Sequence, residues 1–328
     1  MLIPGVDPYS IFRKRCFAPD SGWAAGEQWD FFLSAYNASE RVRTVYSQAR
    51  ADKKYWVIHP EYRLIGDALP PEPKFEPSAN GEDEFVIDLV NQLILNGYDP
   101  QSSSLCIDIT GMLRPHLLFL VRALQKQGVS RFDALYSEPA YYRQKAATAF
   151  SAGMFSGVRQ VAGYEGISNI DTSSDLLIIG MGFDAQQTKE VAEDKDKAHK
   201  IQLFGLPSLR ADMYQQSVLR SREVADWLGD PSFAPANRAA APANDPFVTA
   251  NILSELVAER EARHPPTNIY LSPLGTKAQA LGFALFYIGE CVGKNRSIIF
   301  PFSTEYSPKT TKGLSRIWLY GIEFPIFP

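Results

Sequence analysis

DEFV at Asp83–Val86 and DPFV at Asp245–Val248 lie 162 positions apart, and the same shift brings IDI at Ile107 onto IYL at Ile269. In both places a helix pattern begins at the acidic residue, and a short apolar run typical of a buried strand follows further along the chain. One gapless offset therefore joins a helix start to a strand in each half of the sequence. This internal duplication predicts two copies of one fold unit.

The two halves also correspond upstream of this stretch. DFFL at Asp30–Leu33 aligns with DLLI at Asp175–Ile178, and YWVIHP at Tyr55–Pro60 aligns with IQLFGL at Ile201–Leu206. Nearly continuous apolar strands that alternate with helices are typical of parallel sheets covered on both faces. We therefore expect an α/β fold with two tandem Rossmann-like parallel-sheet units related by internal duplication.

The expected domain boundaries follow from this duplication. Residues 1–150 are predicted to form the first Rossmann-like half with an N-terminal extension, and residues 172–328 the second half, which a strand over Arg316–Phe324 closes. Prolines interrupt residues 69–81, so that stretch is predicted to be a loop. The Ala/Pro-rich stretch 229–245 is predicted to be an insertion that the first copy lacks.

Composition excludes several classes of protein. With 45% hydrophobic residues among 328, the chain can fill two cores, yet it has no uninterrupted apolar run long enough to span a membrane. The net charge of −4, without a block of lysine or arginine, argues against binding to duplex nucleic acid but suits a small anion held by local cations. The four histidines lack HxxxH or HExxH spacing, so neither a metal nor a cofactor is expected. Three widely separated cysteines favour a reducing cytoplasm.

Two loops at the ends of predicted strands carry the residues that an anion site needs. In open parallel sheets, ligands bind at the carboxyl ends of strands, where helix N-termini direct backbone N–H groups toward them. Each loop combines a hydroxyl residue, a glycine and a cation at a helix start, and these are Thr110, Gly111 and Arg114 in the first copy and Ser272, Gly275, Thr276 and Lys277 in the second. The alternative is that the glycines only permit tight turns from strand to helix.

The segments Ile107–Arg114 and Ile269–Lys277 resemble the signature of CARF domains, in which a strand, Thr-Gly-Gly-Thr-Lys and a helix follow one another. CARF domains are Rossmann-like sensors of cyclic oligonucleotides in prokaryotic defence systems, and the related SAVED domain fuses two such units in one chain. Here Arg114 replaces the lysine of the first copy, and Pro273 and Leu274 replace threonine and glycine in the second. The resemblance implies a nucleotide second messenger between the two halves, bound by the hydroxyls, glycines and cations of both loops.

Other strand ends add further candidates for ligand binding. Asn37 and Asp184 follow the first strand of each copy, where they either cap the next helix or contact a ribose or phosphate. Tyr142 and Tyr306 follow the last strands, where each ring either stacks on a base or completes the core.

Three functions fit these residues. The first is a cytoplasmic sensor or regulatory protein that binds a nucleotide-like anion, such as a cyclic oligonucleotide, in a prokaryotic antiviral defence or stress system and signals to a separate effector protein. The second is a nucleotide- or phosphoester-acting enzyme, with Asp108 and Arg114 acting on the substrate and Glu138 pairing with Asp108 for metal binding or acid–base catalysis. The third is a structural subunit of a larger complex. The sequence leaves open whether any reaction is catalysed.

Overall fold

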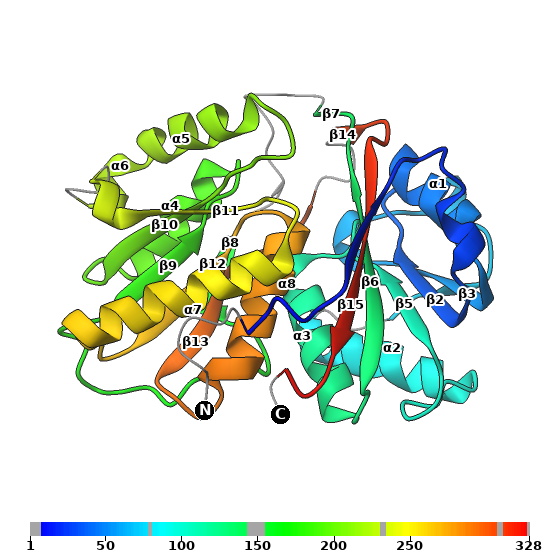
Figure 1. The fold of residues 1–328 in the computed structure, drawn as a ribbon, viewed down its shortest axis with the longest axis horizontal. Coiled ribbons are helices and arrows are strands. Elements are labelled where there is room, and N and C mark those ends of the chain that lie inside the picture. Colours follow the sequence, from blue (N-terminus) through cyan, green and yellow to red (C-terminus); the bar gives the residue numbers. More distant parts are fainter. Residues whose placement is uncertain (1–7, 78–80, 143–154, 230–233, 307–310, 327–328) are drawn as a thin grey trace. The chain divides into compact units, whose positions relative to one another are not determined.

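The computed structural model describes residues 8–77, 81–142, 155–229, 234–306 and 311–326. These residues form two compact units, each built around its own sheet (Figure 1). The first unit contains residues 12–142, 304–306 and 311–326, and the second contains residues 8–11 and the described part of 155–303.

The first unit is built on a seven-stranded mixed sheet. Its elements are β1 (Lys14–Phe17), η1 (Trp23–Gly26), β2 (Trp29–Ala35), α1 (Glu40–Gln48), β3 (Ala51–Val57), η2 (Pro60–Tyr62), η3 (Gly66–Ala68), β4 (Lys74–Phe75), α2 (Glu82–Leu95), β5 (Leu105–Asp108), α3 (Arg114–Lys126), β6 (Arg131–Glu138), β7 (Tyr141–Tyr142), β14 (Thr311–Lys312) and β15 (Arg316–Glu323). The sheet order is β1-β15-β6-β5-β2-β3-β4, in which β6 through β4 are parallel and β15 and β1 are antiparallel. Numbered along the chain, the five parallel strands have the Rossmann order 3-2-1-4-5.

The second unit is built on a six-stranded sheet with the same core order. Its elements are β8 (Phe155–Gln160), β9 (Leu176–Gly180), α4 (Ala185–Asp194), β10 (His199–Gly205), α5 (Met213–Glu223), α6 (Ala225–Leu228), η5 (Pro235–Asn237), β11 (Arg238–Ala241), α7 (Pro246–Arg263), β12 (Ile269–Pro273), α8 (Lys277–Phe286), η6 (Tyr287–Cys291) and β13 (Arg296–Ser303). The sheet order is β11-β10-β9-β12-β13-β8, with β8 antiparallel to β13 and the other strands parallel. The parallel strands again have the order 3-2-1-4-5.

The predicted fold class is confirmed, because both units are α/β and share one strand order. The aligned sequence segments fall on equivalent elements. DFFL lies in β2 and DLLI at the start of β9, which are the first parallel strands, and IDI and IYL lie at β5 and β12, which are the fourth.

The helices form where apolar residues recur at helical spacing. Phe85, Leu89 and Leu93 are buried along one face of α2, which packs against α3. Asp245 caps α7 by accepting hydrogen bonds from the N–H groups of Phe247 (3.1 Å) and Val248 (3.2 Å). In the described part of the chain, every helix falls short of the length and apolar character needed to cross a lipid bilayer.

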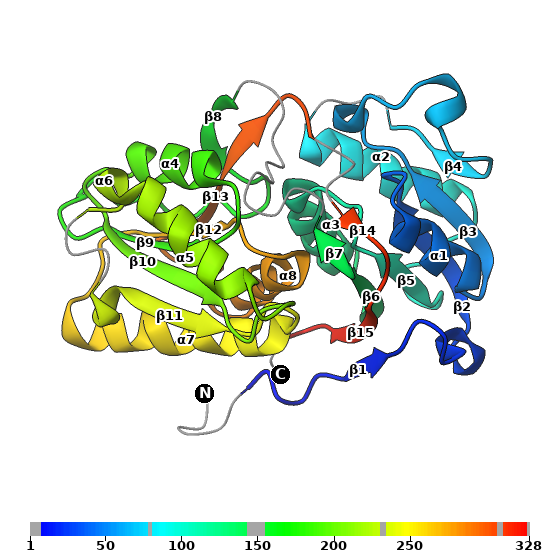
Figure 2. The same ribbon diagram turned by 90° about the horizontal axis from the view of Figure 1, so that it is seen from above.

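The strand over residues 316–323 lies in the first sheet, although the sequence suggested that it closes the second half. Strand β15 pairs antiparallel with β6, from Arg316 opposite Glu138 to Glu323 opposite Arg131, and lies between β1 and β6 in Figure 1. The strand that lies at the β13 edge of the second sheet is instead β8, which falls between the two predicted halves, and it lies beside β13 in Figure 2. Apolar periodicity predicts that a segment is a strand but not which sheet it joins.

The third strand of each sheet lies in a stretch that the sequence suggested to be irregular. Strand β4 falls within the proline-rich residues 69–81 and pairs with β3. Strand β11 falls within residues 229–245 and pairs with β10. The Ala/Pro-rich stretch is therefore not an insertion unique to the second copy. Both strands are short edge strands, and β11 consists of one arginine and three alanines, so neither has the apolar run that predicts a strand.

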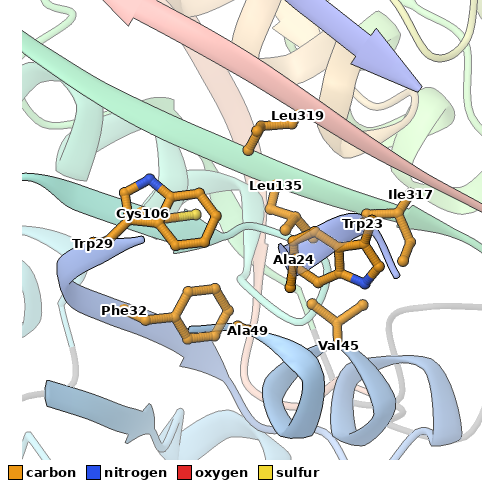
Figure 3. Close-up of a cluster of buried hydrophobic side chains, with 10 residues drawn as sticks. All are labelled: Trp23, Ala24, Trp29, Phe32, Val45, Ala49, Cys106, Leu135, Ile317 and Leu319. Carbon is orange, nitrogen blue, oxygen red and sulfur yellow. The ribbon is translucent and has the colours of Figure 1, made fainter. Parts of the chain in front are cut away.

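Figure 3 shows a hydrophobic cluster on one face of the first sheet. It joins strands β2, β5, β6 and β15 to helix α1 and to η1, through Trp23, Ala24, Trp29, Phe32, Val45, Ala49, Cys106, Leu135, Ile317 and Leu319. Burying a side chain as large as Ile317 or Leu319 stabilises a fold by about 1.5–3 kcal/mol. Strand β15 is therefore part of the core of the first unit.

Candidate functional site

Polar side chains replace apolar ones at the carboxyl edge of the first sheet. Three residues of the cluster in Figure 3, Phe32 of β2, Cys106 of β5 and Leu135 of β6, are each followed two positions later by a buried polar residue. These polar residues are Ser34, Asp108 and Ser137. Residues two apart on a strand share a face. These three side chains therefore lie on the face of the sheet that α1 covers.

A hydrogen-bonded network joins the ends of these strands. Ser34 Oγ donates to Asp108 Oδ2 (2.8 Å), and the Thr110 N–H donates to Asp108 Oδ1 (3.0 Å). Thr110 Oγ1 accepts the Ser137 N–H (3.0 Å) and lies 3.0 Å from Ser137 Oγ. We call Ser34, Asp108, Thr110 and Ser137 the edge network. It fixes the loop after β5 relative to β2 and β6.

The hydrogen bonds of the edge network act on the pKa of Asp108. Burial raises the pKa of Asp108, and the hydrogen bonds from Thr110 and Ser34 oppose that shift. Glu138 follows Ser137 directly and therefore points to the opposite face of the sheet, where its Oε1 accepts a hydrogen bond from Trp318 Nε1 (2.7 Å). The side chains of Asp108 and Glu138, the two candidate catalytic carboxylates, therefore point to opposite faces of the sheet. Which face each one takes depends on how β5 and β6 pair, and the sequence alone does not give that pairing.

Two buried arginines lie in the first turns of the helices that follow β2 and β5. Arg41 is the second residue of α1 and is 8% exposed, and Arg114 is the first residue of α3 and is 9% exposed. Arg41 Nη1 donates to the Ser137 carbonyl oxygen, while Arg41 Nε is buried with no hydrogen-bond partner among the described residues. The sequence singled out Arg114 as a candidate but not Arg41.

The same two helices begin without a side-chain cap. Ser39 and Leu113 stand at the N-cap positions of α1 and α3, and neither makes a side-chain cap hydrogen bond. In the second unit, Asp184 caps α4 by accepting the Gln187 N–H (3.3 Å), and Thr276 caps α8 by accepting the Gln279 N–H (3.1 Å). Helices α1 and α3 of the first unit therefore have an arginine in the first turn and begin without a side-chain cap, whereas their counterparts in the second unit, α4 and α8, begin with a side-chain cap.

Gly111 packs backbone against backbone. An added Cβ at Gly111 would lie 1.9 Å from the Ala35 carbonyl oxygen, at the point where the strand order reverses between β2 and β5. Gly182 makes the matching contact in the second unit, where a Cβ would lie 2.3 Å from the Leu274 carbonyl oxygen. Close approach of the two loops thus accounts for both glycines.

The predicted loop of the second unit is engaged in its own capping interactions. Gln279 Oε1 accepts the Thr276 N–H (3.2 Å) and lies 2.4 Å from where a Cβ on Gly275 would stand, and Thr276 Oγ1 donates to the Ala243 carbonyl oxygen. Lys277 is half-buried as the first residue of α8. Ser272 is fully buried in β12, and its hydroxyl has no hydrogen-bond partner among the described residues.

Asn37 and Tyr62 join the loops after β2, β3 and β5. Asn37 Oδ1 accepts the Ser39 N–H (3.1 Å), and its side chain also hydrogen-bonds Tyr62. Tyr62 donates its hydroxyl to the Gly111 carbonyl oxygen (2.8 Å). Burial raises the pKa of Tyr62, Glu61 raises it further, and the charge of Arg114 opposes the shift. The phenol therefore lies within electrostatic range of Arg114.

Of the two candidate tyrosines, Tyr306 lies near this edge. Its N–H donates to the Glu61 carbonyl oxygen (3.2 Å), and its ring is partly exposed. Tyr142 pairs with Thr311 in the small β7–β14 sheet, and its side chain lies outside the described part of the structure.

A cluster of two histidines and one glutamate lies on the face covered by α2 and α3, and sequence reasoning missed it. His59 follows β3, Glu61 lies in η2 and His116 is the third residue of α3; one ligand atom from each lies within 4.8 Å of the others. Both imidazoles are buried. Burial raises the pKa of Glu61, and the neighbouring carboxylate of Glu82 raises it further. We call His59, Glu61 and His116 the histidine cluster.

The histidine cluster belongs to the first unit alone. The Tyr36 N–H donates to the Val57 carbonyl oxygen, and the Met181 N–H makes the same bond to Leu203, so Gly205 occupies the place of His59. The third residue of α8 is Gln279, where α3 has His116. This difference between the aligned copies was the available signal, because YWVIHP aligns its histidine with glycine in IQLFGL.

The second unit has a cavity of about 270 Å³ at the opposite edge of its sheet. It lies at the amino ends of β9 and β10 and is lined by Lys197, His199, Arg260 and His264, together with Asp175. Burial lowers the pKa of His199, and the charge of Arg260 lowers it further. The charges of Lys197 and Arg260 make this cavity a second place where an anion could bind, so it provides a control for the first unit.

Comparisons with known proteins place the chain in no family. No family model and no curated protein match the sequence. Among solved structures, CobK precorrin-6A reductase matches 83% of this chain and 89% of its own, with 13% sequence identity and a TM-score of 0.24. A likeness this low carries no argument, so the fold assignment depends on strand order and the function is argued from the site.

Proposed function

We propose that this protein binds a small nucleotide-like anion at the carboxyl edge of the first sheet. The observation that carries this proposal is the pair of buried arginines, Arg41 and Arg114, at the uncapped starts of α1 and α3. These helices follow the first and fourth parallel strands, between which the strand order reverses. Ligands of open α/β sheets bind at that reversal.

The chemistry of the edge suits a phosphate. The first N–H groups of a helix and its dipole attract an anion, and arginine adds two parallel hydrogen-bond donors. Burial strengthens each of these interactions, because the effective dielectric constant inside a protein is lower than in water. With a net charge of −4, the chain as a whole does not attract anions, so the attraction is local.

A nucleoside beyond the phosphate would find Tyr306 near the same loops. Tyr306 is a half-buried residue whose N–H donates to the Glu61 carbonyl oxygen, and an aromatic ring at this edge could stack on a base. Together with the CARF-like segment Ile107–Arg114, this favours a nucleotide over inorganic phosphate. In this proposal the protein is a cytoplasmic sensor in a prokaryotic defence or stress system and signals to a separate effector.

Phosphoester chemistry at Asp108 lacks comparable support. Both oxygens of its carboxylate accept hydrogen bonds within the edge network, and the side chain is fully buried. A sensor needs the ligand to shift a conformational equilibrium, for which no reaction is required.

Thermal unfolding with a panel of cyclic and linear nucleotides tests the proposal. At least one nucleotide should raise the melting temperature of the wild-type protein, and calorimetric titration should then give its dissociation constant. Arg114→Ala should weaken binding about 10-fold to 100-fold, since a hydrogen bond to a charged group contributes about 1.5–3 kcal/mol. Arg114→Lys separates loss of charge from loss of the two-donor geometry.

The control variant is Arg260→Ala, which removes a cation from the cavity of the second unit. It should bind the nucleotide as the wild type does. The proposal fails if no nucleotide stabilises the protein, or if Arg260→Ala abolishes binding while Arg114→Ala preserves it.

A further inference from the structure

The histidine cluster has the ligand types of a transition-metal site. Two imidazoles and one carboxylate are ligands of zinc and of non-haem iron, and three protein ligands leave coordination positions for water or another ligand. This set of ligands comes from the residues after β3, which supply His59 and Glu61, and from α3, which supplies His116. The two histidines are 57 positions apart in the sequence.

The geometry is close to that of a bound ion. His116 Nε2 lies 3.3 Å from Glu61 Oε1, and His59 Nδ1 lies 4.0 Å from Glu61 Oε2. Two ligands bound tetrahedrally to zinc at its usual bond lengths stand about 3.4 Å apart. The first separation matches this value. The three ligand atoms together lie within 4.8 Å of one another, so side-chain rotations would be needed to bring all three to that spacing.

Aromatic contacts hold both imidazoles in fixed orientations. The Phe85 ring stacks on His59 with ring centroids 4.8 Å apart, and its edge meets His116 at 4.7 Å. The two histidine rings themselves meet edge to face at 4.7 Å. Metal sites bind more tightly when their ligands are held in place before the ion arrives.

The Glu61 carboxylate lies close to another acidic side chain, and one of its oxygens has no hydrogen-bond donor in the described part of the chain. Glu61 Oε2 is buried and accepts no hydrogen bond from the described residues. Glu82, at the start of α2, is 2% exposed and its charge acts on Glu61. Burying two carboxylates near each other is costly, and a divalent cation would offset that repulsion.

We propose that His59, Glu61 and His116 bind one divalent transition-metal ion, with zinc or ferrous iron as the chemical class. The inference goes beyond nucleotide binding and does not depend on it. His116 follows Arg114 by two positions along α3. The second unit lacks the site because Gly205 and Gln279 stand in place of the two histidines.

Metal titration of the full chain without nucleotide tests this inference. The protein is stripped with a chelator, freed of any affinity tag, and titrated with Zn²⁺ alone by calorimetry, with elemental analysis of the dialysed complex. We expect about one Zn²⁺ per chain for the wild type, as three protein ligands hold catalytic zinc. Glu61→Gln and His116→Gln should each weaken binding by about 100-fold or more, because even residues behind the ligands contribute 10-fold to 100-fold.

His199→Gln is the matched control, because this histidine lies in the second unit outside the cluster. It should bind Zn²⁺ as the wild type does. Circular dichroism of the metal-free variants checks folding, and Glu61→Gln covers the case in which His116→Gln does not fold, since the Glu61 side chain is 17% exposed. The inference is overturned if the wild type binds no Zn²⁺ at micromolar concentration, or if a folded Glu61→Gln variant binds Zn²⁺ with wild-type affinity.

Discussion

Single residues at the carboxyl edge of the first sheet fall into two groups. Asp108, Thr110 and Gly111 hold the loop after β5 in place, through hydrogen bonds and through close backbone contact. Arg41 and Arg114 bring positive charge to the starts of two helices. Substitutions in the first group should therefore affect stability, and substitutions in the second should affect ligand affinity.

Gly111→Ala should lower stability by about 2–4 kcal/mol, because the new methyl group would collide with the Ala35 backbone. Thermal unfolding measures the loss. Gly26→Ala is the control, since no atom lies within 4 Å of the added Cβ there, and it should stay within about 0.5 kcal/mol of the wild type. Equal melting temperatures for Gly111→Ala and the wild type would contradict the backbone contact.

Asp108 should make stability depend on pH. Burial raises the pKa of Asp108 in the folded state above its usual value, so the fold is more stable when this carboxyl is protonated. That contribution is fully present below the unfolded pKa and is lost as the pH rises through the folded pKa. The difference in the free energy of unfolding between the wild type and Asp108→Asn, measured with urea, should therefore change across this pH window. A difference that stays constant with pH would argue against a raised pKa.

The sequence placed some of these residues at the carboxyl edge of the first sheet. Arg114, Thr110 and Gly111 were found because one strand end and one helix start follow each other directly in the chain. His59 and His116 were missed because the contact joins the loop after β3 to α3, and no local spacing records it. Arg41 was missed for a related reason, since its contact with Ser137 spans 96 positions.

At the level of elements, long apolar strands could be predicted and short edge strands could not. Strands β2, β5, β9 and β12 have continuous apolar runs, and all four lie where the sequence placed them. Strand β4 has two residues and β11 is mostly alanine, so both depend on pairing with a neighbour rather than on their own side chains. Whether such a segment becomes a strand is therefore decided by the neighbouring strand with which it pairs, and the segment's own sequence does not show it.

Aspartate substitutions in β11 distinguish a strand from a surface insertion. Ala241 is fully buried and Ala240 is exposed, although the two are neighbours. Ala241→Asp should lower the melting temperature strongly, equivalent to about 3–5 kcal/mol, because it buries an unpaired charge. Ala240→Asp should be nearly neutral. If both variants unfold at the wild-type temperature, residues 238–241 do not form a buried strand.

At the level of the whole molecule, each unit is assembled from separate parts of the chain. The first unit takes β15 from residues 316–323, and the second takes residues 8–11 from the start of the described chain. Tyr9 is fully buried and donates a hydrogen bond to Glu290 (2.9 Å). The correspondence between the two halves of the sequence therefore describes the strand order of the sheets more closely than it describes the boundaries of the units.

Removal of residues 304–328 should unfold the first unit and spare the second. The truncation takes Ile317 and Leu319 out of the core in Figure 3 and exposes β6. Limited proteolysis with mass spectrometry should then show rapid cleavage within residues 12–142 and resistance within residues 155–303. Adding a peptide of residues 311–326 should restore protection. Undiminished resistance of residues 12–142 in the truncated chain would rule out a structural role for β15.

Hydrogen–deuterium exchange tests the central claim most directly, because it locates the bound anion. The measurement compares the protein alone with the protein saturated by the nucleotide that stabilises it most. We predict slower exchange over residues 36–43 and 110–117, which contain the starts of α1 and α3, and no such slowing in Arg114→Ala at the same nucleotide concentration. Protection confined to the cavity residues 173–176 and 260–264 of the second unit, with residues 36–43 and 110–117 unchanged, would contradict the account.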